Sequence, residues 1–138
     1  MVCLHTIKEI TMNIKILLAA LLSSLTLGIH VFAGGSDVHI PILESELSDP
    51  LKTIISVIWH AITAILLINA IALVYAGFNP DYKKPIILLI SAQYFFWAGL
   101  FIFYGIKDFA SIWTMPQWIA FIIIPILAIA GLRNKNSN

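Results

Sequence analysis

The chain carries little charge for its length. Only 11% of its 138 residues are Asp, Glu, Lys or Arg, whereas soluble domains carry about 25%. Hydrophobic residues make up 60% of the sequence, and its mean hydropathy is +0.96. A chain this short cannot bury so much apolar surface in a core of its own. The composition therefore excludes an ordinary soluble domain and predicts that the lipid bilayer surrounds most of the chain.

Cysteine and dense basic clusters are also scarce. The single cysteine, Cys3, excludes an internal disulfide, and no CxxC or haem-attachment motif is present. A net charge of +1 without a basic stripe argues against a nucleic-acid partner. Ser36, Asp37 and His39 are close in sequence, but a catalytic triad requires a spatial arrangement that neighbours on an extended loop do not adopt. No catalytic residue is identified, and a non-enzymatic role is favoured.

Four apolar segments stand out, at residues 16–33, 51–77, 85–104 and 115–132. About 20 apolar residues in a helix cross the roughly 30 Å of hydrocarbon in a bilayer. The predicted fold is an all-α integral membrane four-helix bundle, a single domain over residues 1–138. Gly34-Gly35 predicts a helix stop, and Ser48-Asp49-Pro50 predicts a helix start with proline in the first turn. Thr114 to Gln117 form a capping box, and Pro125 predicts a kink inside the last segment.

The first apolar segment has two interpretations. Lys15, an apolar centre and Val31-Phe32-Ala33 before Gly34 are typical of a cleaved signal peptide. The same residues fit a retained first span that ends at Gly34-Gly35. Retention is favoured because one helical face carries a polar stripe that a discarded peptide does not need: Ala19, Ser23, Thr26 and His30. Met12, followed by Asn13-Ile14-Lys15, also resembles a second translation start.

The basic residues predict the orientation. If the N-terminus is cytoplasmic, the inner segments hold six Lys and Arg residues and the outer segments hold two. We therefore expect both termini in the cytoplasm, and we expect the membrane to be a bacterial inner membrane. The segment 34–51 then forms an acidic outer loop that carries Asp37, Glu44, Glu46 and Asp49.

Three of the four histidines gather in the outer half, with Asp37, and form the candidate ligand cluster His30, Asp37, His39 and His60. Imidazoles on two helices can ligate haem or copper, which makes His30 and His60 the candidate metal ligands. Their depths differ, at about 5 Å and 12 Å below the ends of their spans, and this disfavours a shared haem. A copper or zinc site on His30, Asp37 and His39 is easier to build. The favoured alternative is that the histidines form hydrogen bonds across helices, such as His60 with Thr63 or Gln93, or cap the loop.

Other polar and aromatic residues are expected to face the bundle interior, because their hydrogen bonds cannot be met in lipid. They are Ser23, Thr26, Ser56, Thr63, Gln93, Trp97 and Tyr104. Asn69 lies about 180° around its helix from His60, so the two cannot point at one site. Lys52, at the outer end of the segment 51–77, is the one charged residue within a predicted span. No Asp, Glu, Lys or Arg lies deeper in any of the four segments, which disfavours a proton-linked transporter.

Two motifs carry a family resemblance. Gly-Gly-Ser-Asp37-Val-His39-Ile-Pro41 after the first span, with Trp59-His60-Ala-Ile-Thr63 in the second, resembles small bacterial four-span membrane protein families of unknown function. The resemblance implies a four-helix membrane fold and no specific activity. We expect a non-catalytic structural or accessory subunit whose partners are the bilayer and another membrane protein or a second copy. The alternatives are a haem- or metal-binding membrane protein and a small proton-linked transporter.

Overall fold

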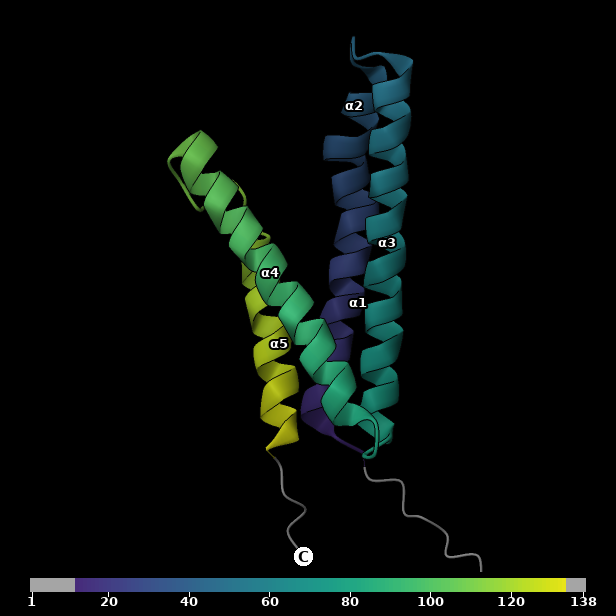
Figure 1. Cartoon of the computed structure of the whole chain (residues 1–138), viewed down its shortest axis with the longest axis vertical. Coiled ribbons are helices and arrows are strands. Elements are labelled where there is room, and N and C mark those ends of the chain that lie inside the picture. The colour runs from purple at the N-terminus through teal and green to yellow at the C-terminus, as the bar shows by residue number, and fades with distance from the viewer. Residues whose placement is uncertain (1–11, 134–138) are drawn as a thin grey trace, which may run out of the picture.

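The computed structural model describes residues 12–133, which are almost entirely helical (Figure 1). Cys3, Lys8, Lys135 and a start at Met1 lie outside this range. The elements in chain order are α1 (Ile14–Gly34), a π-helical turn η1 (Gly35–His39), α2 (Ile40–Glu44), α3 (Asp49–Phe78), α4 (Lys83–Phe109) and α5 (Trp118–Leu132). No strand occurs in the described range, so the predicted all-α fold is confirmed.

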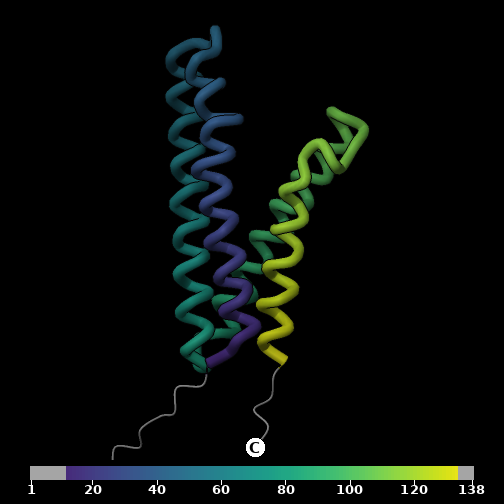
Figure 2. Tube along the Cα trace, turned by 180° about the vertical axis from the view of Figure 1, so that it is seen from behind, coloured from purple at the N-terminus to yellow at the C-terminus, as the bar shows by residue number. Residues whose placement is uncertain are grey.

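The four long helices run alternately up and down and form two arms. α1 packs along α3, α4 packs along α5, and α1 also contacts α5. The arms meet at the end where the described chain begins and ends, and they diverge towards the other end (Figures 1 and 2). We call the joined end the basal end and the open end the distal end. The described chain is consistent with the predicted helical bundle, and its two arms are splayed into a V.

Three segments are long and apolar enough to cross a membrane: Ile14–Glu44, Asp49–Phe78 and Lys83–Phe109. α5 has only 15 residues, or about 22 Å at 1.5 Å per residue. Large apolar side chains point outward on every arm, and Leu89 is 73% exposed and Ile29 66% exposed. Such a surface is stable only when lipid or another apolar partner covers it. The chain is a membrane-embedded helical protein.

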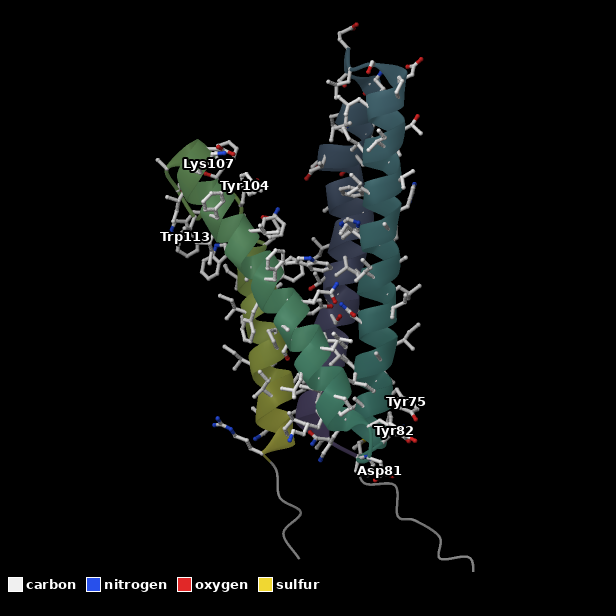
Figure 3. All side chains as sticks on the ribbon, in the orientation of Figure 1. Tyr75, Asp81, Tyr82, Tyr104, Lys107 and Trp113 are labelled. Carbon is white, nitrogen blue, oxygen red and sulfur yellow. The ribbon has the colours of Figure 1, made fainter. Side chains whose placement is uncertain are left out.

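Aromatic residues mark both ends of the embedded region. Figure 3 places Tyr75 and Tyr82 at the basal end and Tyr104 and Trp113 at the distal end. Tyr82 and Tyr104 are separated by 22 positions of sequence, a helical rise of about 33 Å. This is close to the roughly 30 Å thickness of a bilayer core, and Tyr and Trp favour its two interfaces.

The predicted helix stop at Gly34-Gly35 and the loop over 34–51 are wrong. Both glycines adopt right-handed helical angles, and the backbone N–H of Ile40 donates to the carbonyl of Gly35 in an i to i−5 bond. The wider π turn precedes Pro41, which has no N–H of its own and crowds an α-helical turn. Helical structure thus continues to Glu44, and the connection to α3 shrinks to residues 45–48.

The other boundary signals had mixed outcomes. α3 begins where predicted, with Ser48 at the N-cap position and Pro50 in the first turn, but the side chain of Ser48 makes no capping hydrogen bond. The capping box at Thr114 to Gln117 is wrong, because α5 begins at Trp118 and no side chain caps it. The indole Nε1 of Trp118 instead donates to the carbonyl of Ile112 at 3.0 Å and holds the turn. Pro125 lies buried inside α5, and the kink there stays a prediction.

Asn13 joins three helices at the basal end. Its side-chain oxygen caps α1 by accepting from the N–H of Ile16, and its Nδ2 donates to the carbonyl of Gly131 at 2.8 Å. Its backbone N–H donates to the carbonyl of Gly77 at 2.9 Å. Both glycines lie against α1, where a methyl group would overlap Leu17 or Ile16. The absence of side chains at Gly77 and Gly131 lets α3 and α5 approach α1 closely.

Candidate functional site

The candidate site is a cluster of aromatic rings in the distal half of the α1–α3 arm. The indole of Trp59 is stacked with the imidazole of His30, with ring centroids 4.1 Å apart and an interplanar angle of 19°. The imidazole of His39 is also stacked with Trp59, at 5.1 Å and 5°. Two rings from the first helical segment therefore lie against one ring of α3. We call this arrangement the His–Trp cluster.

Hydroxyl groups of α3 hold both imidazoles in place. Nε2 of His30 lies 3.0 Å from Oγ1 of Thr63, and Nε2 of His39 lies 3.1 Å from Oγ of Ser56. Each hydroxyl also donates to a carbonyl one turn back in its own helix, at 3.0 Å. A hydroxyl has a single hydrogen, so each must accept from the imidazole. Both histidines therefore carry a hydrogen on Nε2, and any lone pair lies on Nδ1.

His60 sits at the edge of the cluster. Its ring meets that of His39 edge to face, with centroids 5.6 Å apart and planes at 86°, and its side chain is exposed. The predicted pairing of His60 with Thr63 or Gln93 is wrong, because Thr63 is bonded to His30 and Gln93 is bonded to Asn69. Residue 60 follows Trp59 by one position, which turns it about 100° away from α1.

Asp37 does not join the histidines. It is exposed, and one of its carboxylate oxygens accepts from Oγ of Ser36 at 3.0 Å. The same Oγ lies 2.9 Å from the carbonyl of Ala33, so its single hydrogen is shared between these two acceptors. His39 is bonded to Ser56 instead, so the triplet Ser36, Asp37 and His39 does not form a triad. Within residues 12–133, no group of three or more His, Cys, Asp or Glu side chains could hold a metal ion.

A second polar cluster lies where the two arms separate. Oγ of Ser23 in α1 and the hydroxyl of Tyr94 in α4 are 2.7 Å apart. Nδ2 of Asn69 in α3 donates to Oε1 of Gln93 in α4 at 2.9 Å, and Asn69 also lies beside the Tyr94 hydroxyl. The four side chains, which we call the junction network, connect α1, α3 and α4.

The predicted interior set is only partly correct. Ser23 is fully buried and Gln93 finds a partner in the bundle, as expected. Trp97 is half-buried and packs between Tyr94 and Phe121, with centroid distances of 5.7 and 5.3 Å. Thr26 bonds only to the carbonyl of Leu22 in its own helix. Tyr104 is exposed at the distal end, where Nζ of Lys107 lies 5.4 Å from the centre of its ring.

Sequence analysis missed the central roles of Trp59 and Tyr94. Both belong to apolar runs in which an aromatic residue looks like packing bulk. For Trp59, a usable signal is the spacing of Ser56, Trp59 and Thr63 at i, i+3 and i+7, which places them along one helical face. Gly34 on α1 lies under the indole, since a methyl group there would be 3.0 Å from Cη2 of Trp59.

Comparisons with protein-family models, curated proteins and solved structures find no match to this chain. The family resemblance drawn from the two histidine motifs therefore stays a prediction.

Proposed function

We propose that this protein is a non-catalytic subunit of a membrane assembly, with four membrane segments and a cytoplasmic basal end. The described basal end holds four basic residues, whereas the distal part of the chain holds two, Lys52 and Lys107. The basal four are Lys15, Lys83, Lys84 and Arg133. α5 and the turn before it form the fourth segment, in which Trp113 and Trp118 pair at 5.9 Å near the distal interface.

We further propose that α1 is retained as a membrane span. α1 contacts both α3 and α5, and Ile16 and Ala19 are completely buried. Ser23 adds a buried hydrogen bond to Tyr94 of α4. Removal of α1 would expose these partners and eliminate the His–Trp cluster. The mass of the purified protein tests this: a product that begins after Ala33 would overturn the proposal.

The observation that carries the assembly proposal is the divergence of the two arms. Gln93 of α4 faces α3, because it accepts a hydrogen bond from Asn69. Leu100 and Tyr104 lie on that same face, seven and eleven positions further along. Yet both are exposed, at 41% and 44%, because α3 has moved away at that level. A helix face that points inward without a neighbour is suited to binding a helix from another subunit.

Site-specific photo-crosslinking in native membranes tests this proposal. We would place a benzophenone amino acid at Leu100, on the inward face, and in a second variant at Leu89, which is 73% exposed and serves as the lipid-facing control. We expect a discrete protein adduct at Leu100, identifiable by mass spectrometry, and only lipid adducts at Leu89. Equal adduct patterns at the two positions, or lipid adducts alone at both, would overturn the proposed subunit contact.

A copper or zinc site is the second candidate, and the proximity of His39 and His60 favours it. Their ring centroids are 5.6 Å apart, and Nδ1 of His39 is the nitrogen available for a metal, since Nε2 donates to Ser56. A haem ligated by His30 and His60 fits less well, because Trp59 covers the ring of His30 and Thr63 occupies its Nε2. Elemental analysis of the purified protein beside His60→Ala decides: stoichiometric metal that disappears in the variant supports the site.

A further inference from the structure

A shallow groove runs along the basal half of α5. It has a volume of about 200 Å³ and is lined by Ile126, Ile129, Ala130 and Arg133. These residues follow the spacing i, i+3, i+4 and i+7, so they form a single stripe on the helix. Three of them are apolar, and the one at the end of the helix is a cation. This arrangement matches a phospholipid, which has an apolar chain attached to a charged headgroup.

The hydrogen bonds of Asn13 bring further cations to the same level. Nδ2 of Asn13 donates to the carbonyl of Gly131. Lys15 follows Asn13 by two residues, and Arg133 follows Gly131 by two residues. Lys15 of α1 and Arg133 after α5 therefore each lie two residues from one partner of the same hydrogen bond. The bond from the N–H of Asn13 to Gly77 places the end of α3 at this level too.

Basic residues outnumber acidic residues in the described segments at the basal end. The turn from α3 to α4 adds Lys83 and Lys84, and Asp81 is the one acidic residue in the described basal segments. The side chain of Arg133 is exposed and makes no hydrogen bond or ion pair with a residue in the described range. Guanidinium groups bind phosphate oxygens in a bidentate manner, and basic pockets beside transmembrane helices recognise anionic headgroups.

The groove and the basic residues lie at the basal membrane interface, which is the level of a phospholipid headgroup. The basal aromatic pair, Tyr75 and Tyr82, has its ring centroids 6.2 Å apart and marks the interface at this end (Figure 3). Arg133 follows directly after the last residue of α5, at the basal interface, while Ile126 lies about 10 Å deeper by helical rise. An acyl chain along the groove would thus run into the bilayer, with its phosphate next to Arg133.

From this geometry we propose a site for one anionic phospholipid at the basal end. Arg133 holds the phosphate, Lys15 and Lys84 strengthen the field around it, and one acyl chain lies along Ile126, Ile129 and Ala130. The inference needs only that the chain is embedded in a membrane. It holds whether or not the distal face of α4 binds another subunit.

Native mass spectrometry of the full chain in detergent tests the site. The protein would be offered equal amounts of phosphatidylglycerol and phosphatidylcholine, and the ratio of the two bound lipids measured. We expect phosphatidylglycerol to be preferred. Arg133→Gln should reduce that preference about fivefold, which corresponds to roughly 1 kcal/mol for one basic residue at a membrane surface. Lys107→Gln, at the distal end, is the matched control and should leave the ratio unchanged.

A second variant separates the groove from the charge. Ala130→Phe fills the groove without changing any charge, and it should reduce binding of phosphatidylglycerol and phosphatidylcholine alike. Thermal unfolding of each variant confirms that the helices remain assembled. The proposal fails if phosphatidylglycerol is not preferred, if Lys107→Gln has the same effect as Arg133→Gln, or if Ala130→Phe binds lipid as the unmodified protein does.

Discussion

Gly131 should be the least tolerant of the helical glycines in α1 and α5, and a pair of matched alanine substitutions can measure this. A methyl group at Gly131 would lie 2.6 Å from Cγ1 of Ile16 and 3.0 Å from Oδ1 of Asn13. Ile16 is completely buried, so it cannot turn away, and α5 must shift instead. A methyl group at Gly28 of α1 meets no atom within 4 Å.

The two substitutions share one energy term and differ in another. Replacing Gly by Ala within a helix stabilises it by about 0.8 to 1 kcal/mol. Overpacking a rigid site costs about 1 to 3 kcal/mol, and only Gly131→Ala carries that cost. Gly28→Ala should therefore stabilise the fold, while Gly131→Ala should be neutral or destabilise it by up to about 2 kcal/mol. The difference between the two variants, about 1 to 3 kcal/mol, isolates the overpacking.

Reversible unfolding in mixed detergent micelles, followed by circular dichroism, measures both free energies. Gly131→Ala should also weaken the bond from Nδ2 of Asn13 to the carbonyl of Gly131, because α5 moves outward. If Gly28→Ala and Gly131→Ala change the free energy of unfolding by the same amount, α5 does not pack against Ile16 as described. The close approach of α1 and α5 would then be refuted.

Three further experiments, with four substitutions between them, test the polar contacts. A double-mutant cycle with Asn69→Leu and Gln93→Leu should give a coupling free energy of about 0.6 kcal/mol, and no more than about 1.7, as for interhelical hydrogen bonds in membranes. Asn13→Ala should cost about 1 kcal/mol for the lost cap of α1, plus about 0.6 kcal/mol for the bond to α5, in the same unfolding assay. Thr63→Val should cost about 0.6 kcal/mol, because the hydrogen bond between Nε2 of His30 and Oγ1 of Thr63 is lost.

Each of these tests has a control and an outcome that contradicts it. Thr26→Val removes a hydroxyl that bonds only within its own helix, so it should cost less than Thr63→Val, and an equal cost would argue against the bond to His30. Additive effects of the Asn69 and Gln93 substitutions would mean that the amides do not interact. If Asn13→Ala is as stable as the unmodified chain, the three-helix contact at the basal end does not contribute to folding.

Helix positions were the most predictable feature. A long apolar segment in lipid must pair its own backbone N–H and C=O groups, and a helix is the simplest way to do so. The predicted spans 51–77 and 85–104 lie inside α3 and α4, each a few residues short at both ends. The glycine stop failed, because Gly34 can form either a cap or a close helix contact. Its environment decided the outcome, since the indole of Trp59 lies directly against it.

The histidines of the candidate site were predictable, but Trp59 at its centre, the separation of Asp37 from it and the pairings were not. The sequence placed His30, His39 and His60 in one half of the molecule, and the structure brings them around Trp59. The register between α1 and α3 decides which imidazole forms a hydrogen bond with Thr63. Helical periodicity fixes the faces of one helix, but it contains no information on how far one helix slides along another.

Local composition and the thickness of a bilayer were enough to predict the lipid environment, the all-α class, the approximate positions of the long helices and the concentration of basic residues at one end. Tertiary structure alone decided the V shape, the π turn at Gly35–His39 and the partners of the buried polar groups. Those features depend on close contacts between residues far apart in sequence, such as Asn13 with Gly131. A buried polar group bonds to whichever partner packing brings within about 3 Å.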